Sequence, residues 1–175
     1  MTVASDVLKA AGVFFVAVVL QSAIVSSIQP GGGTADLVLV TLTAVALLRG
    51  AVFGAVVGFY AGFLLDAADL ETLGLSSLLL TLAGYWIGRY GETTGRDRAH
   101  APILAIAVVT VLFALSSLAM HYVLGDPVSA RAGLVDALPA EIVLNLLLTI
   151  PVYALCRRIF ARPGTRPAME VELGT

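Results

Sequence analysis

Three polar residues recur at a spacing of four near the end of the chain: Glu141, Asn145 and Thr149. This spacing places a carboxyl, an amide and a hydroxyl group on one face of a helix, inside an otherwise apolar run. An ionisable group at membrane depth is costly unless it is paired, lies near the lipid headgroups or faces a wet cavity. The face is therefore either part of an outward-facing polar pocket or a set of hydrogen bonds that ties helices together.

Asp36, Arg49 and Asp66 are further charged residues that border apolar segments. With Glu141 and Asn145 they make up a predicted polar interface. Asp66 and Glu141 each lie close to the expected end of a span, where we expect water to reach the carboxylate. This position favours a role at helix ends, where a carboxylate can cap the backbone, over a role in a pocket.

The sequence lacks the patterns that would make these groups catalytic or metal-binding. It contains no HExxH, no GxSxG, no phosphate loop and no pair of catalytic carboxylates on a shared element. Cys156 is the only cysteine, which excludes an internal disulfide and a multi-cysteine metal site. We therefore expect no enzyme activity, no cofactor and no metal.

The composition indicates an integral membrane protein. Hydrophobic residues make up 59% of the 175 residues and charged residues only 13%, and the mean hydropathy is +0.98. Soluble domains are about half apolar and a quarter charged. The formal net charge of -2 is too small to suggest a nucleic-acid partner, so the lipid bilayer is the expected environment.

Apolar runs predict the membrane spans. A straight crossing of a hydrocarbon core of about 30 Å needs about 20 helical residues. The second and third runs are each shorter than this, so they form either one long span with Arg49 buried in it, or two short spans joined by a very tight turn at Arg49 and Gly50. The six-span interpretation has spans at about 10–28, 37–48, 51–65, 73–88, 103–124 and 138–160.

The basic residues favour six spans over five. With six spans and a cytoplasmic N-terminus, nine of the ten Lys and Arg residues lie on the cytoplasmic side, and only Arg131 lies outside. We therefore predict an all-α membrane protein in which residues 1–160 form one bundle of six short transmembrane helices, with both termini cytoplasmic. Residues 161–175, which are polar and rich in Pro and Gly, are expected to be a disordered cytoplasmic tail.

Glycines at a spacing of four mark two of the predicted spans. Lipid provides little hydrophobic drive for helices to associate, so close approach of backbones over small residues stabilises their packing. The stripes either pack the six spans against one another or form a groove for a helix of another protein, and the sequence leaves both possibilities open. The residues of this predicted helix-packing or partner groove are Gly50, Gly54, Gly58, Gly62, Gly84 and Gly88.

A constellation of residues stands out between positions 36 and 91. Its members are Asp36-Leu37, Arg49-Gly50, Gly54, Gly58, Phe59, Gly62, Leu65-Asp66, Leu73-Gly74, Leu78 and Gly84-Tyr85. With these residues the segment resembles the core of the rod shape-determining protein MreD family. Length and six short spans fit along the whole chain, and one departure is Ala35, where the family often has proline.

The resemblance implies an integral membrane scaffold of the cell-elongation (rod) complex in the bacterial cytoplasmic membrane. Such a scaffold binds the membrane helix of MreC and supports cell-shape control and lateral peptidoglycan synthesis. Through MreC it acts indirectly with the elongation transpeptidase and glycosyltransferase, above MreB filaments.

The family is also similar in helix layout to the substrate-binding S components of ECF vitamin transporters, which supplies an alternative function. An S component should enclose a polar, aromatic pocket near the outer face. The predicted external ends contain no tryptophan and a single tyrosine, Tyr122, where a vitamin site is usually lined by several such residues. The scaffold is therefore the preferred hypothesis.

Overall fold

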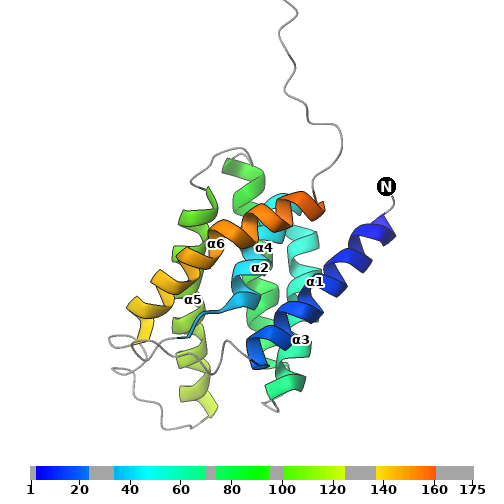
Figure 1. Ribbon diagram of the computed structural model, residues 1–175. Helices are drawn as coiled ribbons and strands as arrows, with labels where there is room; N and C mark the ends of the chain where they lie inside the picture. Colours follow the sequence, from blue (N-terminus) through cyan, green and yellow to red (C-terminus); the bar gives the residue numbers. More distant parts are fainter. Residues whose placement is uncertain (1–2, 24–33, 70–73, 95–100, 125–136, 161–175) are drawn as a thin grey trace, which may run out of the picture.

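The computed structural model describes residues 3–23, 34–69, 74–94, 101–124 and 137–160, which form α-helices and contain no strand (Figure 1). The predicted all-α, six-helix fold class is confirmed for these residues. The helices are α1 (Val3–Ala23), α2 (Leu37–Arg49), α3 (Ala51–Asp69), α4 (Leu75–Thr94), α5 (Ala101–Leu124) and α6 (Leu138–Phe160).

Three of these helices are long and apolar enough to cross a membrane, as judged by length and composition. They contain the candidate spans Ser5–Ala23, Ala51–Ala68 and Leu138–Phe160. Shorter apolar helices cover Leu37–Arg49 and Pro102–Ser116. These helices agree with the membrane setting that the composition predicts.

Several helices extend beyond the apolar runs that predicted them. α1 begins at Val3 rather than at residue 10, while residues 24–28 of that predicted span lie outside the described residues. α3 continues to Asp69 and α4 to Thr94, past the predicted ends at 65 and 88. Hydropathy predicts where a chain leaves the hydrocarbon core of the bilayer, whereas a helix continues as long as its backbone hydrogen bonds do. The predicted tail at 161–175 also lies outside the described residues.

α2 is the central helix of the bundle. It contacts each of the other five helices, and every residue from Val38 to Leu47 is buried. Its first turn is capped by Asp36, whose carboxylate accepts a hydrogen bond of 2.8 Å from the Leu39 N–H. A helix buried on all sides needs no polar face, which explains why its sequence is apolar except for Thr41, Thr43 and the terminal Arg49.

α2 and α3 are joined by a turn of a single residue, Gly50. Its φ angle is +96°, in the left-handed region that glycine adopts without steric cost. The Gly50 N–H donates to the Ala46 carbonyl at 2.8 Å, and the Gly50 carbonyl accepts from the Gly54 N–H at 2.9 Å. The structure therefore has two short helices and a tight turn, the arrangement that the basic residues favour over one long span.

The remaining helices surround α2. α3 and α4 run side by side as an antiparallel pair, and α5 packs against α4 and α6 (Figure 1). α1 and α6 lie on the same side of α2, where both contact it (Figure 1). α1 and α6 contact both ends of α2, whereas α3 contributes at the Arg49 end and α5 at the Asp36 end. These neighbours place the polar groups described next.

Candidate functional site

The glycine stripe of α3 packs directly against the backbone of α4. A Cβ atom placed on Gly58 would overlap the backbone carbonyl of Leu80, and one on Gly54 would overlap the carbonyl oxygen of Gly84. The relation is mutual, because a Cβ on Gly84 would overlap the carbonyl of Gly54. Only glycine permits two backbones to approach this closely.

The same register continues to both ends of the helix pair. A Cβ on Gly62 would overlap the backbone of Ser76 and Ser77, and one on Gly88 would overlap Gly50 and Ala51. Because the two helices are antiparallel, each glycine four residues further along α3 contacts the α4 backbone about four residues earlier in the sequence. The occupant of the predicted glycine groove is a helix of the same chain, which leaves no space there for a helix of another protein.

Carboxylates from each member of the α3–α4 pair cap the start of the other. Asp66 of α3 accepts hydrogen bonds from the backbone N–H groups of Gly74 at 2.7 Å and Ser76 at 3.1 Å. Glu92 of α4 accepts a hydrogen bond of 2.9 Å from the Ala51 N–H at the start of α3. These N–H groups have no partner within their own helix, and a carboxylate also favours the positive end of the helix dipole.

The position of Asp66 corrects one prediction. We expected water to reach its carboxylate, but the residue is only 1% exposed. Burial is tolerated because both carboxylate oxygens accept hydrogen bonds from the start of α4. Its role at a helix end agrees with the interpretation that the sequence favoured.

Arg49 lies at the α2–α3 turn and connects four helices. Its guanidinium forms an ion pair of 2.5 Å with Asp6 of α1, and the side chain is only 10% exposed. The guanidinium carbon lies 5.6 Å from the ring centroids of both Phe53 in α3 and Phe160 in α6. An ion pair flanked by two aromatic rings keeps the cation stable away from water.

A second polar cluster lies at the opposite end of α2. The Asp36 N–H donates to the Asn145 side-chain oxygen at 2.7 Å, and the Asn145 amide donates to the Thr110 hydroxyl at 3.1 Å. Asn145 and Thr110 are each no more than 2% exposed. This amide therefore ties the start of α2 to both α5 and α6, and the Thr149 hydroxyl donates back to the Asn145 carbonyl at 2.6 Å.

Gln21 adds α1 to this cluster. Its side-chain oxygen accepts a hydrogen bond of 2.7 Å from the Leu37 N–H, and its amide donates to the Ala35 carbonyl at 3.2 Å. Glu141 is partly exposed and lies one helical turn before Asn145 in α6. The cluster satisfies backbone groups at the start of α2 that would otherwise be unpaired in an apolar setting.

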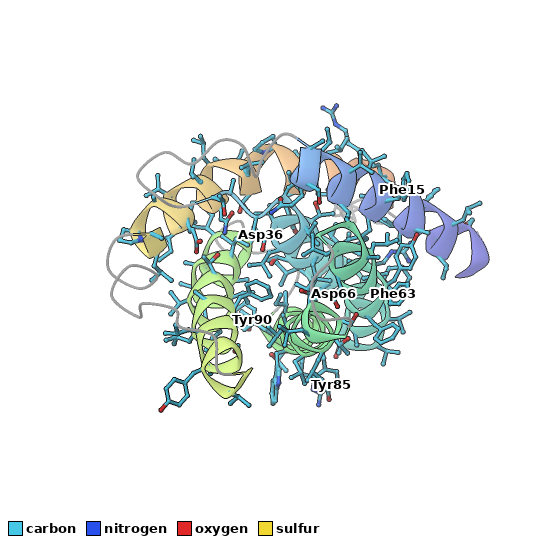
Figure 2. The ribbon with its side chains drawn as sticks, turned by 90° about the horizontal axis from the view of Figure 1, so that it is seen from below. Phe15, Asp36, Phe63, Asp66, Tyr85 and Tyr90 are labelled. Carbon is cyan, nitrogen blue, oxygen red and sulfur yellow. The ribbon has the colours of Figure 1, made fainter. Side chains whose placement is uncertain are left out.

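The predicted polar interface is therefore three separate structures and not one site. Asp36, Asn145 and Glu141 gather at one end of α2, Arg49 lies at the other end, and Asp66 caps α4. Figure 2 shows Asp36 and Asp66 at separate places in the bundle. Within the described residues, no three His, Cys, Asp or Glu side chains are grouped so that they could hold a metal ion.

Sequence reasoning missed four residues that complete these structures, namely Asp6, Gln21, Glu92 and Thr110. Asp6 and Glu92 lie outside the predicted spans at 10–28 and 73–88. Gln21 and Thr110 lie in apolar runs and have no polar residue three or four positions away that would mark a helix face. Their partners lie far away in sequence, for example 35 residues for Thr110 and Asn145, so no local spacing could reveal them.

Among the outer faces of the described helices that expose apolar side chains, two are considered as binding surfaces. A ridge along α3 consists of Val52, Val56, Phe59 and Phe63, which are between 50% and 76% exposed, and Figure 2 shows Phe63 at the edge of the bundle. A groove of about 550 Å³ lies between α1 and α6 over α2. We refer to these surfaces as the α3 ridge and the α1–α6 groove.

Comparison with known families gives one match that covers most of the chain. The family model described as rod shape-determining protein MreD matches residues 7–159 of the 175 residues. No curated protein and no solved structure is similar enough to match. The family match extends beyond residues 36–91, the region that carries the resemblance in the sequence, and it includes parts of all six helices.

Proposed function

We propose that this chain, which belongs to the rod shape-determining protein MreD family, is an integral membrane scaffold of the cell-elongation complex. Family membership makes it a rod shape-determining membrane protein, and its apolar helices agree with this assignment. The match over residues 7–159 is the observation that carries the proposal. In the proposed role the chain binds the membrane helix of MreC and so supports lateral peptidoglycan synthesis.

The proposed orientation places both termini in the cytoplasm of a bacterium. The end of the bundle with Arg49 also carries Lys9 in the first half of α1 and Arg157 and Arg158 in the last turn of α6. Short cytoplasmic segments accumulate Lys and Arg. This distribution supports a multi-pass protein of the cytoplasmic membrane whose basic end faces inward.

The use of the buried polar groups supports a structural role. Asp66 caps α4, Arg49 connects four helices, and Asn145 joins α2 to α5. A catalytic site needs polar groups directed at a substrate, whereas these groups are directed at other parts of the chain. A scaffold needs only a stable shape and an outer surface for its partner.

The α3 ridge is the surface that we assign to the MreC helix. The glycine faces of α3 and α4 are filled by each other, so a partner helix must use another face. Val52, Val56, Phe59 and Phe63 follow spacings of four, three and four, which is the seam that a second helix packs against in a coiled coil. The seam is also rich in aromatic residues, which contribute strongly at protein interfaces.

The test is co-purification with the MreC protein of the same genome from membranes. We expect the native chain to co-elute with MreC. The variant with both Phe59→Ala and Phe63→Ala should lose at least 80% of the co-eluting MreC, which is roughly the effect of weakening the binding free energy by 1 kcal/mol. A matched control, Leu104→Ala with Leu112→Ala, shortens two exposed residues on α5 and should retain MreC. Failure of the native chain to co-elute would refute the scaffold, whereas equal retention by both variants would refute only the ridge.

The S component of an ECF transporter remains the alternative that the helix layout suggests. In an S component, the cluster around Asn145 would have to face a vitamin. Here its amide and the Gln21 amide are engaged in bonds between helices, and the α1–α6 groove is lined almost entirely by apolar side chains. These observations support the scaffold, and a tightly retained vitamin in the purified protein would reverse the preference.

A further inference from the structure

The α1–α6 groove is an apolar channel with a closed floor. Its walls come from α1 and α6, and Leu37 and Thr41 of α2 form the floor. The lining residues are Leu8, Lys9, Gly12, Val13, Val16, Ala17, Leu20, Leu37, Thr41, Val152, Leu155, Cys156 and Ile159. The groove is open at Gly12, because a Cβ atom placed there would have no neighbour within 4 Å.

Lys9 is the one charged residue in this lining, and it lies near the basic end of the bundle. It follows Asp6, the ion-pair partner of Arg49, by one helical turn. A lysine at this level can extend its ammonium group from an apolar wall towards the lipid headgroups. An apolar groove with a cation at its mouth is complementary to a molecule with an anionic head and an apolar tail.

The length of the groove matches one acyl chain. Along α1 it extends from Leu8 to Leu20, which is about 18 Å at 1.5 Å per residue. Beyond Leu20, the Gln21 side chain joins α1 to Leu37 and Ala35 at the start of α2. A lipid tail occupies one leaflet, about half of a hydrocarbon core of about 30 Å, so a groove of this length can hold one tail.

We propose that the α1–α6 groove binds one acyl chain of an anionic phospholipid, whose phosphate lies at Lys9. The tail fills the space beside Gly12 and Val16, and the ammonium group pairs with the phosphate oxygens. Binding of this kind requires only that the chain lies in a membrane. It is therefore independent of MreC and of the α3 ridge on the neighbouring helix.

The test uses the full chain in nanodiscs with equal amounts of phosphatidylglycerol and phosphatidylcholine. After transfer to detergent, native mass spectrometry counts the phospholipids that stay bound. The native chain should retain one phosphatidylglycerol, and Gly12→Leu, which fills the groove, should lose it. Lys9→Gln should reduce the preference for phosphatidylglycerol about fivefold, the effect expected for one interfacial cation.

Two control variants separate the groove from general effects. Ala154→Leu adds comparable bulk at an exposed position of α6 outside the lining, and Arg158→Gln removes an exposed cation from the last turn of α6. Both controls should bind lipid like the native chain. If Gly12→Leu fails to fold, Val16→Trp fills the same space from a residue that is 55% exposed.

Two results would overturn the proposal. One is equal retention of phosphatidylglycerol by the native chain and by folded groove-filling variants. The other is a photo-reactive residue at position 16 that captures a protein helix or a second copy of this chain in place of phospholipid. Neither result depends on MreC, so the lipid proposal and the scaffold proposal can fail separately.

Discussion

Replacing Gly58 by alanine tests the central packing of the fold. The added Cβ would meet the carbonyl group of Leu80 and the N–H of Thr81, which belong to the backbone of α4 and cannot rotate away. The two helices would have to separate by about 1 Å to restore normal contact distances, which weakens dispersion contacts along the whole pair. Overpacking of this kind costs about 3 kcal/mol.

A glycine series provides the graded comparison. At Gly91 the nearest atoms to an added Cβ are the Leu47 carbonyl oxygen at 3.1 Å and Cα at 3.2 Å, so a small shift accommodates it. We expect a cost of about 1 kcal/mol for Gly91→Ala. At Gly12 nothing lies within 4 Å, and Gly12→Ala should change stability by less than about 0.5 kcal/mol.

The Tm of each variant is measured by thermal unfolding in detergent, with size-exclusion chromatography as the readout of the folded protein. About 3 kcal/mol corresponds to a fall in Tm of about 6 to 12 °C for Gly58→Ala, against no more than about 2 °C for Gly12→Ala. Because the overlap is with backbone, adding Leu80→Ala should not restore the Tm. A Gly58→Ala protein as stable as the Gly12→Ala protein, or one rescued by Leu80→Ala, would show that α3 and α4 do not meet along this stripe.

Four other substitutions and one exchange of two residues have expected outcomes in the same assay. Asp66→Ala removes two backbone hydrogen bonds at a buried position and should lower the free energy of unfolding by about 2 kcal/mol. Glu92→Ala removes one such bond at a more exposed cap and should lower it by about 1 kcal/mol. Equal losses would contradict this ranking. Arg49→Leu leaves Asp6 unpaired and should lower the free energy of unfolding by about 3 kcal/mol. The double variant Asp6→Arg with Arg49→Asp exchanges the two residues and should restore part of the lost Tm. A double variant no more stable than Arg49→Leu would show that the ion pair contributes nothing. Asn145→Leu strands a backbone N–H and a hydroxyl group and should cost about 2 kcal/mol, a result refuted by an unchanged Tm.

The sequence was sufficient to predict the helices and the tight turn because both depend on local information. Long apolar runs determine which segments can cross a membrane, and Arg49-Gly50 between two short runs admits few geometries. Glycines four residues apart also predict close helix packing. The partner helix of the stripe could not be assigned, because Gly54 meets Gly84 and Gly58 meets Leu80 only once α3 and α4 are placed together.

The polar interface was harder to predict because its members lie far apart in sequence. Asp36 and Asn145 are separated by 109 residues, and Gln21 has no periodic neighbour that would identify it. Spacing shows which residues share a helix face, but it does not show which helix that face meets. The sequence therefore supplied most of the polar residues, and tertiary structure divided them into separate clusters.

The short central helix explains why so many polar groups are tolerated within the bundle. α2 has 13 residues, so it is about 20 Å long and cannot by itself cross a hydrocarbon core of about 30 Å. Its ends therefore lie at depths where bare backbone groups would be costly in lipid. At the start of α2, the backbone N–H groups donate hydrogen bonds to the side chains of Asp36, Gln21 and Asn145. At its end, the Gly50 turn continues the backbone hydrogen bonds and the Arg49 ion pair neutralises the charge. α1 and α6 shield parts of both ends, so the polar clusters are the consequence of placing a helix shorter than the membrane at the centre of the fold.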